Sequence, residues 1–183
     1  MGASVARVAA PAKLNLRLVV GGLRADGYHP VQSLMVTLGC LTDTVLGEES
    51  AVRSVSCPGV AEHENLAWRA IDALEHQIGR ALPCAISIEK RIPAQAGLGG
   101  GSSDAAAALI AVNELYSLSL GDGDLEQIGA TVGSDVPFFI RGGAQWAHGR
   151  GERLSAGWTP DFGAVIVKPG FGLATGDVYR AFD

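Results

Sequence analysis

The sequence predicts an α+β protein with a packed hydrophobic core. Apolar residues make up 48% of the 183 positions and charged residues 18%, a balance typical of globular proteins rather than disordered ones. Segments with the alternation of strands and segments with helical spacing follow one another in mixed order. This order favours α+β over a doubly wound sheet, in which strands and helices would alternate strictly.

The chain opens with a predicted strand in two parts. An apolar run over Val5–Ala10 stops at Pro11. Over Leu14–Leu18, apolar and polar residues alternate, which is the pattern of a strand with one apolar and one polar face. The period of two places Lys13 and Asn15 side by side on the polar face.

A hairpin is predicted next. The dipeptide Asp26-Gly27 is a strong turn signal, and a second strand follows over about Val31–Leu38. Tyr28 and His29 therefore lie near the turn of this hairpin.

The middle of the chain predicts helices around one further strand. Residues 39–62 have an irregular pattern, with strands and loops. Three helices are predicted, at Glu64–Ile78, 102–115 and Asp124–Val132. Apolar residues recur with helical spacing in the first, and the second is rich in alanine. Ala85–Ile92 alternates as a strand, and Gly133 is expected to end the last helix as its C′ residue.

Short elements are predicted in the last third. Gly133–Ile140 is an acid followed by an apolar run. Ala144–His148 and Ala164–Lys168 have the pattern of strands, separated by the polar stretch Gly149–Asp161. A last short helical signal precedes Asp183.

Composition narrows the classes of partner. The net charge of −5 and the pI near 5.3 argue against a nucleic-acid partner, which usually requires a basic patch. No apolar run approaches the roughly 20 residues that span a bilayer, and residues 1–12 do not have the pattern of a signal peptide. We therefore expect neither a nucleic-acid partner nor a membrane partner, and the cysteine usage described next favours a cytoplasmic protein.

Cysteine and histidine spacing predicts neither disulfides nor a metal site. The three cysteines are odd in number and lack a C-x-x-C pair, as expected of reduced thiols; they are Cys40, Cys57 and Cys84. Three histidines without metal-ligand spacing are expected to be structural or exposed, namely His63, His76 and His148.

The most informative stretch is Pro93–Ala107, with the sequence P-A-Q-A-G-L-G-G-G-S-S-D-A-A-A. Its four glycines let the backbone take positive φ and approach a ligand closely. Ser102, Ser103 and Asp104 then supply the N-cap signal of the alanine-rich helix. A glycine loop that runs into a helix N-terminus presents unpaired N–H groups and the positive end of the helix dipole. We therefore predict an anion site, most often one for phosphate.

The common phosphate motifs do not fit this stretch. It has no Gly-Lys-Ser/Thr, so it is not a Walker A loop, and Ser102 occupies the sixth position of a G-x-G-x-x-G frame. The alternative is a flexible surface loop before a helix, but a linker does not require a capped helix directly behind it.

P-x-x-x-G-L-G-G-G-S-S-D-A-A-A resembles the phosphate loop of the GHMP kinases (galacto-, homoserine, mevalonate and phosphomevalonate kinases). In its triple-glycine form it is most similar to the branch that phosphorylates 4-diphosphocytidyl-2-C-methyl-D-erythritol. The resemblance implies that ATP is the cofactor and that the loop holds its phosphates. The residues implied are Pro93, Ala94, Gln95, Ala96, Gly97, Leu98, Gly99, Gly100, Gly101, Ser102 and Ser103.

A lysine and an aspartate are candidates for the chemistry. Taken singly, Lys13 could be solvated and Asp135 a turn former. Together with a phosphate loop, Lys13 would keep the Asp135 carboxylate ionised, and the carboxylate could accept the proton of an attacking alcohol. P-A-K-L-N-L at Pro11–Leu16 and G-S-D-V-P-F-F at Gly133–Phe139 are similar to the branch's motifs, which implies a catalytic lysine at Lys13 and a catalytic base at Asp135.

The same resemblance implies an acceptor site for the cytidine and methylerythritol portions of the substrate. Asn15 and the D-G-Y-H hairpin match it, with Tyr28 stacking on a planar base and His29 bonding to its edge. Thr175 and Tyr179 match, more loosely, a threonine and an aromatic residue that contact the substrate in this family.

Further residues are implied to flank the nucleotide. Asn65 and Leu66 resemble the segment that forms the adenine pocket, and Lys90 precedes the phosphate loop. The alternatives are that Asn65 belongs to the N-cap region of the helix, that Leu66 is a core residue and that Lys90 is a solvated lysine at the end of a strand. Mg²⁺ is expected with ATP; because no carboxylate pair is evident, we expect the ion to be held by phosphates, waters and Ser103.

The implied architecture is the GHMP kinase fold. Residues 1–150 would form an N-terminal domain resembling the second domain of ribosomal protein S5, and 151–183 the start of a ferredoxin-like domain. The family continues beyond this length with a third glycine-rich motif, so the second domain is expected to be incomplete here. Two alternatives stay open: another small-molecule GHMP kinase, of homoserine or mevalonate type, and a nucleotide-binding fragment without activity.

Overall fold

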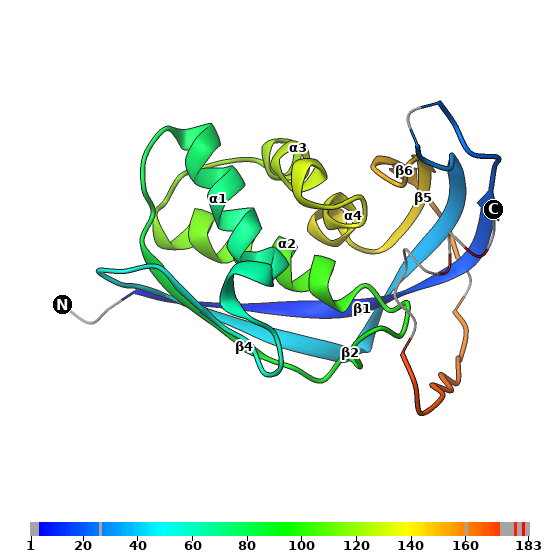
Figure 1. The fold of residues 1–183 in the computed structure, drawn as a ribbon, viewed down its shortest axis with the longest axis horizontal. Helices are drawn as coiled ribbons and strands as arrows, with labels where there is room; N and C mark the ends of the chain where they lie inside the picture. The colour runs from blue at the N-terminus through cyan, green and yellow to red at the C-terminus, as the bar shows by residue number, and fades with distance from the viewer. Residues whose placement is uncertain (1–3, 26, 160, 173–177, 179–180, 182–183) are drawn as a thin grey trace.

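The computed structural model describes residues 4–25, 27–159, 161–172, 178 and 181. In this part of the chain, six strands form one sheet and the helices pack over one of its faces (Figure 1). In spatial order, the strands are β3 (Ser54–Ser56), β4 (Cys84–Glu89), β2 (Val31–Glu49), β5 (Ala144–Gly149) and β6 (Arg153–Ala156), and β1 (Val5–Val20) also pairs with β2. The structure thus confirms the predicted α+β class.

The sheet is built around β2 (Val31–Glu49), a strand of 19 residues. Its first part pairs with β5 (Ala144–Gly149) over Val31–Val36, and its last part pairs with β4 (Cys84–Glu89) over Thr44–Glu49. The prediction that this strand ends near Leu38 was wrong. Residues 39–49 continue it, because they gain a second pairing partner that the local pattern does not reveal.

β1 (Val5–Val20) pairs antiparallel with β2 and confirms the predicted hairpin. The expected stop at Pro11 is absent, since the strand continues through it with a register shift between Pro11 and Ala12. A proline lacks the N–H that a ladder needs, and a register irregularity accommodates it. β3 (Ser54–Ser56) and β6 (Arg153–Ala156) complete the sheet as short strands.

Three helices lie close to their predicted positions, and a fourth, at Val136–Arg141, forms in the apolar run that the sequence analysis did not assign to a helix. They are α1 (Leu66–Ile78), α2 (Gly100–Leu115), α3 (Asp122–Val132) and α4 (Val136–Arg141), with a short 3₁₀ turn at Glu62–Glu64. Two details were wrong. Gly133 ends α3 in an extended conformation, with φ −172°, and not as a left-handed C′ residue. Residues 164–168, predicted as a strand, are not in a strand, and Val165 and Val167 are 91% and 84% exposed.

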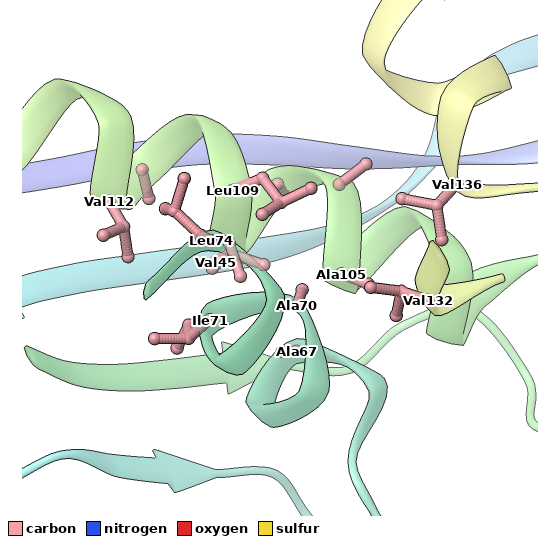
Figure 2. Close-up of a cluster of buried hydrophobic side chains, with 14 of the residues drawn as sticks. Val45, Ala67, Ala70, Ile71, Leu74, Ala105, Leu109, Val112, Val132 and Val136 are labelled. Atoms are coloured by element: carbon pink, nitrogen blue, oxygen red, sulfur yellow. The ribbon is translucent and has the colours of Figure 1, made fainter. Parts of the chain in front are cut away.

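The hydrophobic core lies between the sheet and α2. Leu74 of α1, Leu109 of α2 and Val45 of β2 are all 0% exposed and belong to one cluster (Figure 2). The alanines of α2 at 105–108 are at most 2% exposed, so this helix is enclosed along its small side chains. Each large apolar side chain buried in this way stabilises the fold by about 1.5–3 kcal/mol. The core therefore holds α2, and with it the loop that precedes it, against the sheet.

Among the described residues, no helix combines the length and the apolar character needed to cross a bilayer.

Candidate functional site

A cavity of about 900 Å³ opens where β1, the glycine loop and the first turns of α1 and α2 meet. The loop supplies its largest wall, and polar side chains from distant parts of the chain supply the rest. Its lining includes residues 93–102 together with Lys13, Asn15, Ser33, Asn65, Leu66, Lys90 and Asp135. Loop and candidate catalytic residues therefore share one cavity.

The glycine loop ends in a helix that begins earlier than predicted. Its N-cap is Gly99, with φ +73°, and the helix starts at Gly100 rather than at 102. Ser102, Ser103 and Asp104 therefore belong to the helix and do not cap it. A side chain at residue 99 would be both strained and crowded, because a Cβ there would lie 2.6 Å from Phe139 Cζ. Only glycine fits the position where the chain enters the helix.

The N-terminus of α2 presents unused donors. Its first intrahelical bond runs from the Ser103 N–H to the Gly99 oxygen at 2.9 Å, so the N–H groups of residues 100–102 have no partner within the helix. The Ser103 hydroxyl is 1% exposed and has no hydrogen-bond partner among the described residues. The helix is 16 residues long, so its dipole also favours an anion at this end.

Lys13 lies directly over this loop. Its backbone N–H donates to the Leu98 oxygen at 2.9 Å, and its Cγ would be 2.9 Å from a Cβ at residue 99. The side chain is 9% exposed, and Nζ lies 3.9 Å from Asp135 Oδ2. Burial lowers the pKa of Lys13, and the charge of Asp135 partly offsets that effect. The two candidate catalytic residues thus come together from segments more than a hundred positions apart.

Asp135 lies where the α3–α4 connection reaches the cavity. A turn closed by the Val136 N–H and the Gly133 oxygen at 3.1 Å precedes α4. The side chain of Asp135 is 34% exposed, so it can reach a ligand in the cavity. A Cβ at Gly151 would lie 3.8 Å from Asp135 Oδ1, which places the β5–β6 turn beside the carboxylate.

Asn15 is oriented by a polar chain that includes a residue not predicted. Asn15 accepts a short hydrogen bond from Lys13 Nζ, which confirms that the two side chains share a face. Its Nδ2 donates to Ser33 Oγ at 2.7 Å, and Ser33 Oγ donates to the Arg17 oxygen at 2.7 Å. Ser33 is 2% exposed and lines the cavity. Ser33 lies opposite β1 because of the hairpin register, and that register could not be predicted from the sequence.

The hairpin residues lie farther from the cavity. His29 is 8% exposed, and its Nδ1 is 2.8 Å from the Gly21 oxygen, so it anchors the hairpin loop. Tyr28 is 50% exposed, with the Arg150 guanidinium 4.9 Å from its ring centroid. As outlined by the described residues, the cavity does not have Tyr28 or His29 in its lining. Thr175 and Tyr179 lie outside the described residues.

The first turns of α1 and α2 meet on the side of the cavity that the resemblance implies for the nucleotide. Asn65 is the N-cap of α1 and accepts from the Ala67 N–H at 2.9 Å. Leu66 Cδ1 would lie 3.6 Å from a Cβ at Gly101. Asn65 is 5% exposed and both residues line the cavity, so an N-cap role and a place in the wall are compatible.

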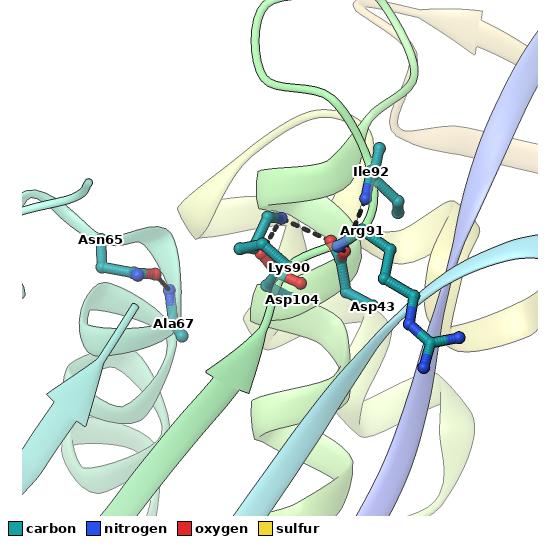
Figure 3. A network of polar contacts seen from close by, with 7 residues as sticks. All are labelled: Asp43, Asn65, Ala67, Lys90, Arg91, Ile92 and Asp104. Atoms are coloured by element: carbon teal, nitrogen blue, oxygen red, sulfur yellow. Dashed lines mark hydrogen bonds and ion pairs between the residues drawn. The ribbon is translucent and has the colours of Figure 1, made fainter. Parts of the chain in front are cut away.

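Lys90 lines the cavity but is bound to two acids. Its Nζ contacts Asp43 Oδ2 and lies 2.6 Å from Asp104 Oδ2 (Figure 3). Burial alone would lower the pKa of Lys90, but the hydrogen bonds to Asp104 and Asp43 outweigh it and the pKa is raised. Sequence reasoning missed both partners: Asp43 fell in a segment with an irregular pattern, and Asp104 was interpreted as part of a cap.

No group of three or more histidine, cysteine, aspartate or glutamate side chains that could hold a metal occurs in the part of the chain that the structure describes. Cys40 is exposed, Cys57 intermediate and Cys84 buried, and all three are free thiols.

Comparison with known proteins finds similarity to one family of kinases. Residues 65–143 match the family model of the GHMP kinases N terminal domain. The chain is 42% identical over 173 residues to a 4-diphosphocytidyl-2-C-methyl-D-erythritol kinase from Desulfitobacterium hafniense, with 94% of this chain and 60% of that protein covered. A relative of the same name from Xanthomonas campestris is also 42% identical, over 176 residues. The chain spans about 60% of the length of these curated relatives.

Solved structures of kinases also resemble this chain. A crystal structure of 4-(cytidine 5'-diphospho)-2C-methyl-D-erythritol kinase superposes with a TM-score of 0.78 at 39% identity, covering 96% of this chain and 64% of that one. A mevalonate kinase from Methanococcus jannaschii superposes with a TM-score of 0.61 at 16% identity, covering 85% of this chain and 56% of that one. The second likeness concerns the fold alone.

Proposed function

Because this chain belongs to the GHMP kinase family, we propose that it takes part in the ATP-dependent phosphorylation of the 2-hydroxyl of 4-diphosphocytidyl-2-C-methyl-D-erythritol. This reaction belongs to the non-mevalonate route to isoprenoid precursors. The relatives that are 4-diphosphocytidyl-2-C-methyl-D-erythritol kinases match over nearly the whole chain. This match supports the cytidine-linked substrate over the substrates of other family members.

One observation carries the proposal. Lys13 Nζ and Asp135 Oδ2 lie 3.9 Å apart in the same cavity as the N–H groups that open α2. Phosphoryl transfer needs an anion cradle for the nucleotide, a cation for the charge on the transferring group and a group that orients the attacking hydroxyl. These three elements occur together here.

The residues divide the work as follows. The N–H groups of residues 100–102 and the positive end of the α2 dipole hold the phosphates of ATP. Asp135 accepts the proton of the attacking hydroxyl, and Lys13 stabilises the negative charge on the transferring phosphoryl group. Asn15, held by Ser33, orients the acceptor. Tyr28, His29, Thr175 and Tyr179 are the remaining acceptor candidates.

Mg²⁺ fits this site as an ion held mainly by the nucleotide and water. The Ser103 hydroxyl, buried and without a hydrogen-bond partner among the described residues, is the candidate protein contact, although Ser102, and not Ser103, is in the cavity lining. When bound, the ion neutralises charge on the β- and γ-phosphates.

A coupled ADP-release assay tests the proposal. The 183-residue chain is given Mg·ATP and the cytidine-linked substrate, with homoserine and mevalonate as matched alternative acceptors. We expect ADP release only with the cytidine-linked compound. Release with homoserine or mevalonate instead would move the chain to another branch of the family.

A second candidate function is nucleotide binding without turnover. It is favoured by one observation, namely that the chain spans about 60% of its curated relatives. Isothermal titration with Mg·ATP, run on this chain and on a chain extended to the relatives' length, separates the two. Binding without ADP release in both proteins would establish the second candidate, whereas release in the longer one alone would assign the chemistry to the combined polypeptide.

A further inference from the structure

Three elements of the fold meet at one partly buried ammonium group. Lys90 follows β4, Asp43 lies on β2 and Asp104 lies on α2 (Figure 3). Asp43 is 0% and Asp104 2% exposed, whereas the Lys90 side chain is 22% exposed. Lys90 Nζ donates to one oxygen of each acid. We call these three residues the Lys90 cluster.

The cluster also fixes the main chain just before the glycine loop. The second oxygen of Asp43, Oδ1, accepts the backbone N–H groups of Arg91 and Ile92, the latter at 2.8 Å. Asp43 therefore binds both the side chain of Lys90 and the backbone that follows it. The segment that leads into the loop is held to β2 at three points.

The first turn of α2 rests on the same groups. A Cβ at Gly100 would lie 3.3 Å from Lys90 Nζ and 3.1 Å from Ile92 Cγ2. Asp104 is one turn further along the helix and takes the other hydrogen bond of Lys90. The ammonium thus joins the end of β4 to the beginning of α2, on either side of the glycine loop.

We infer that Lys90 is a positioning residue, which balances two buried carboxylates and thereby holds the N-terminus of α2 in the orientation that binds phosphate. This inference rests on the proposed function only in taking the loop to bind phosphate. It differs from a direct role at the nucleotide, because two of the three N–H donors of the ammonium are used within the cluster.

Charge balance makes the inference testable. Without the ammonium, two buried carboxylates face one another beneath a site for a polyanion, and a buried charge left unpaired is strongly destabilising. A second substitution that removes one carboxylate relieves this excess. A lysine that acted only by touching the nucleotide would gain nothing from that second change.

The experiment compares four proteins: the unaltered chain, Lys90→Met, Asp104→Asn and the double variant Lys90→Met/Asp104→Asn. Two quantities are measured, the Kd for Mg·ATP and the hydrogen exchange of the amides of residues 100–104 without nucleotide. We expect Lys90→Met to weaken ATP binding by about tenfold or more and to speed exchange, and the double variant to recover at least part of both losses. Asp104→Asn alone leaves one lysine with one aspartate and should change little.

Arg91→Met is the matched control. It removes one cation at the next position, and its side chain is exposed and points away from the cluster in Figure 3. Its Kd for ATP should stay within about twofold of the unaltered chain.

Two outcomes overturn the inference. If Lys90→Met and the double variant bind ATP equally weakly and exchange like the unaltered chain, Lys90 contacts the nucleotide directly and does not act through the cluster. If exchange over residues 100–104 is unchanged by Lys90→Met, the cluster does not hold the helix. Failure of the unaltered chain to bind ATP would instead count against the proposed function, while the exchange measurement still decides the role of the cluster.

Discussion

The backbone N–H of Lys13 donates a 2.9 Å hydrogen bond to the carbonyl oxygen of Leu98. The strand that carries the candidate catalytic lysine is therefore joined to the glycine loop through the main chain. A side-chain substitution cannot remove this bond, so variants at Lys13 and Asp135 should report on chemistry without displacing the loop.

Replacing the candidate base tests its role without changing the shape of the site. Asp135→Asn should lower kcat by about 10²–10⁴-fold, because the amide cannot accept the proton of the attacking alcohol. The Kd for ATP should not change, because Asp135 does not belong to the loop. Initial rates of ADP release and isothermal titration measure the two quantities. A kcat close to that of the unaltered chain would reject the role of base.

The lowered pKa of Lys13 predicts a pH effect. Burial, only partly offset by Asp135, lowers its pKa from the ordinary value of 10.5. Lys13 must be charged to stabilise the phosphoryl group, and it loses its proton as the pH rises through the lowered pKa. The alkaline limb of the kcat/KM profile should therefore begin below pH 10.5.

Asp135 raises the pKa of Lys13, so removing its charge gives an internal check. In a ¹³C NMR titration of the lysine side chains, Lys13 should lose its proton at a lower pH in Asp135→Asn than in the unaltered chain. A midpoint that moves upward would contradict the assignment of Asp135 as its charge partner.

Two glycines of the loop separate backbone strain from crowding. Gly97 and Gly99 have φ of +71° and +73°, but a Cβ would have no neighbour within 4 Å at Gly97 and would lie 2.6 Å from Phe139 at Gly99. Gly97→Ala should cost about 1–2 kcal/mol of the free energy of unfolding, from strain alone. Gly99→Ala should cost clearly more and should also weaken ATP binding. Urea unfolding measures both costs, and equal values would show that Phe139 and Lys13 yield to the extra methyl.

The acceptor side can be weakened by itself through Ser33. Ser33→Ala removes the group that accepts the Asn15 amide at 2.7 Å and leaves that amide without its buried partner. We expect the KM for the acceptor to rise by about tenfold, with the KM for ATP unchanged. Ser87→Ala, at an exposed position of β4, is the matched control and should change neither value. An equal rise in both KM values would show that the defect spreads through the sheet.

Local sequence patterns were sufficient to predict the elements whose determinants lie within one short stretch of the chain. The helix at 64–78, the hairpin of β1 and β2 and the helix behind the glycine loop were each predicted from a short stretch of sequence, and all three agree with the fold. Asp26 of the predicted turn lies outside the described residues. The α+β class followed from the order of the elements. The pairing of Lys13 with Asn15 also followed, because a strand repeats every two residues.

Features that depend on tertiary pairing could not be predicted. The continuation of β2 past Leu38 depends in part on β4, whose paired residues lie 35 to 45 positions further along the chain. Ser33 and Asp43 acquire their roles only because the register brings them beside Asn15 and Lys90. Residues 164–168 have a strand-like pattern but no strand partner among the described residues, so the pattern alone did not make a strand.

The length of β2 has a consequence for how such a protein could acquire new substrates. Ser33, near one end of this strand, binds Asn15 of the proposed acceptor site, and Asp43, ten residues along, binds Lys90 beside the proposed nucleotide site. Ser33 belongs to the part of β2 that pairs with β5, whereas Asp43 immediately precedes the part that pairs with β4. Under the proposed function, substitutions at residues 31–36 would change the specificity for the acceptor alcohol and leave the affinity for ATP unchanged. One nucleotide site would then serve different acceptors in the course of evolution.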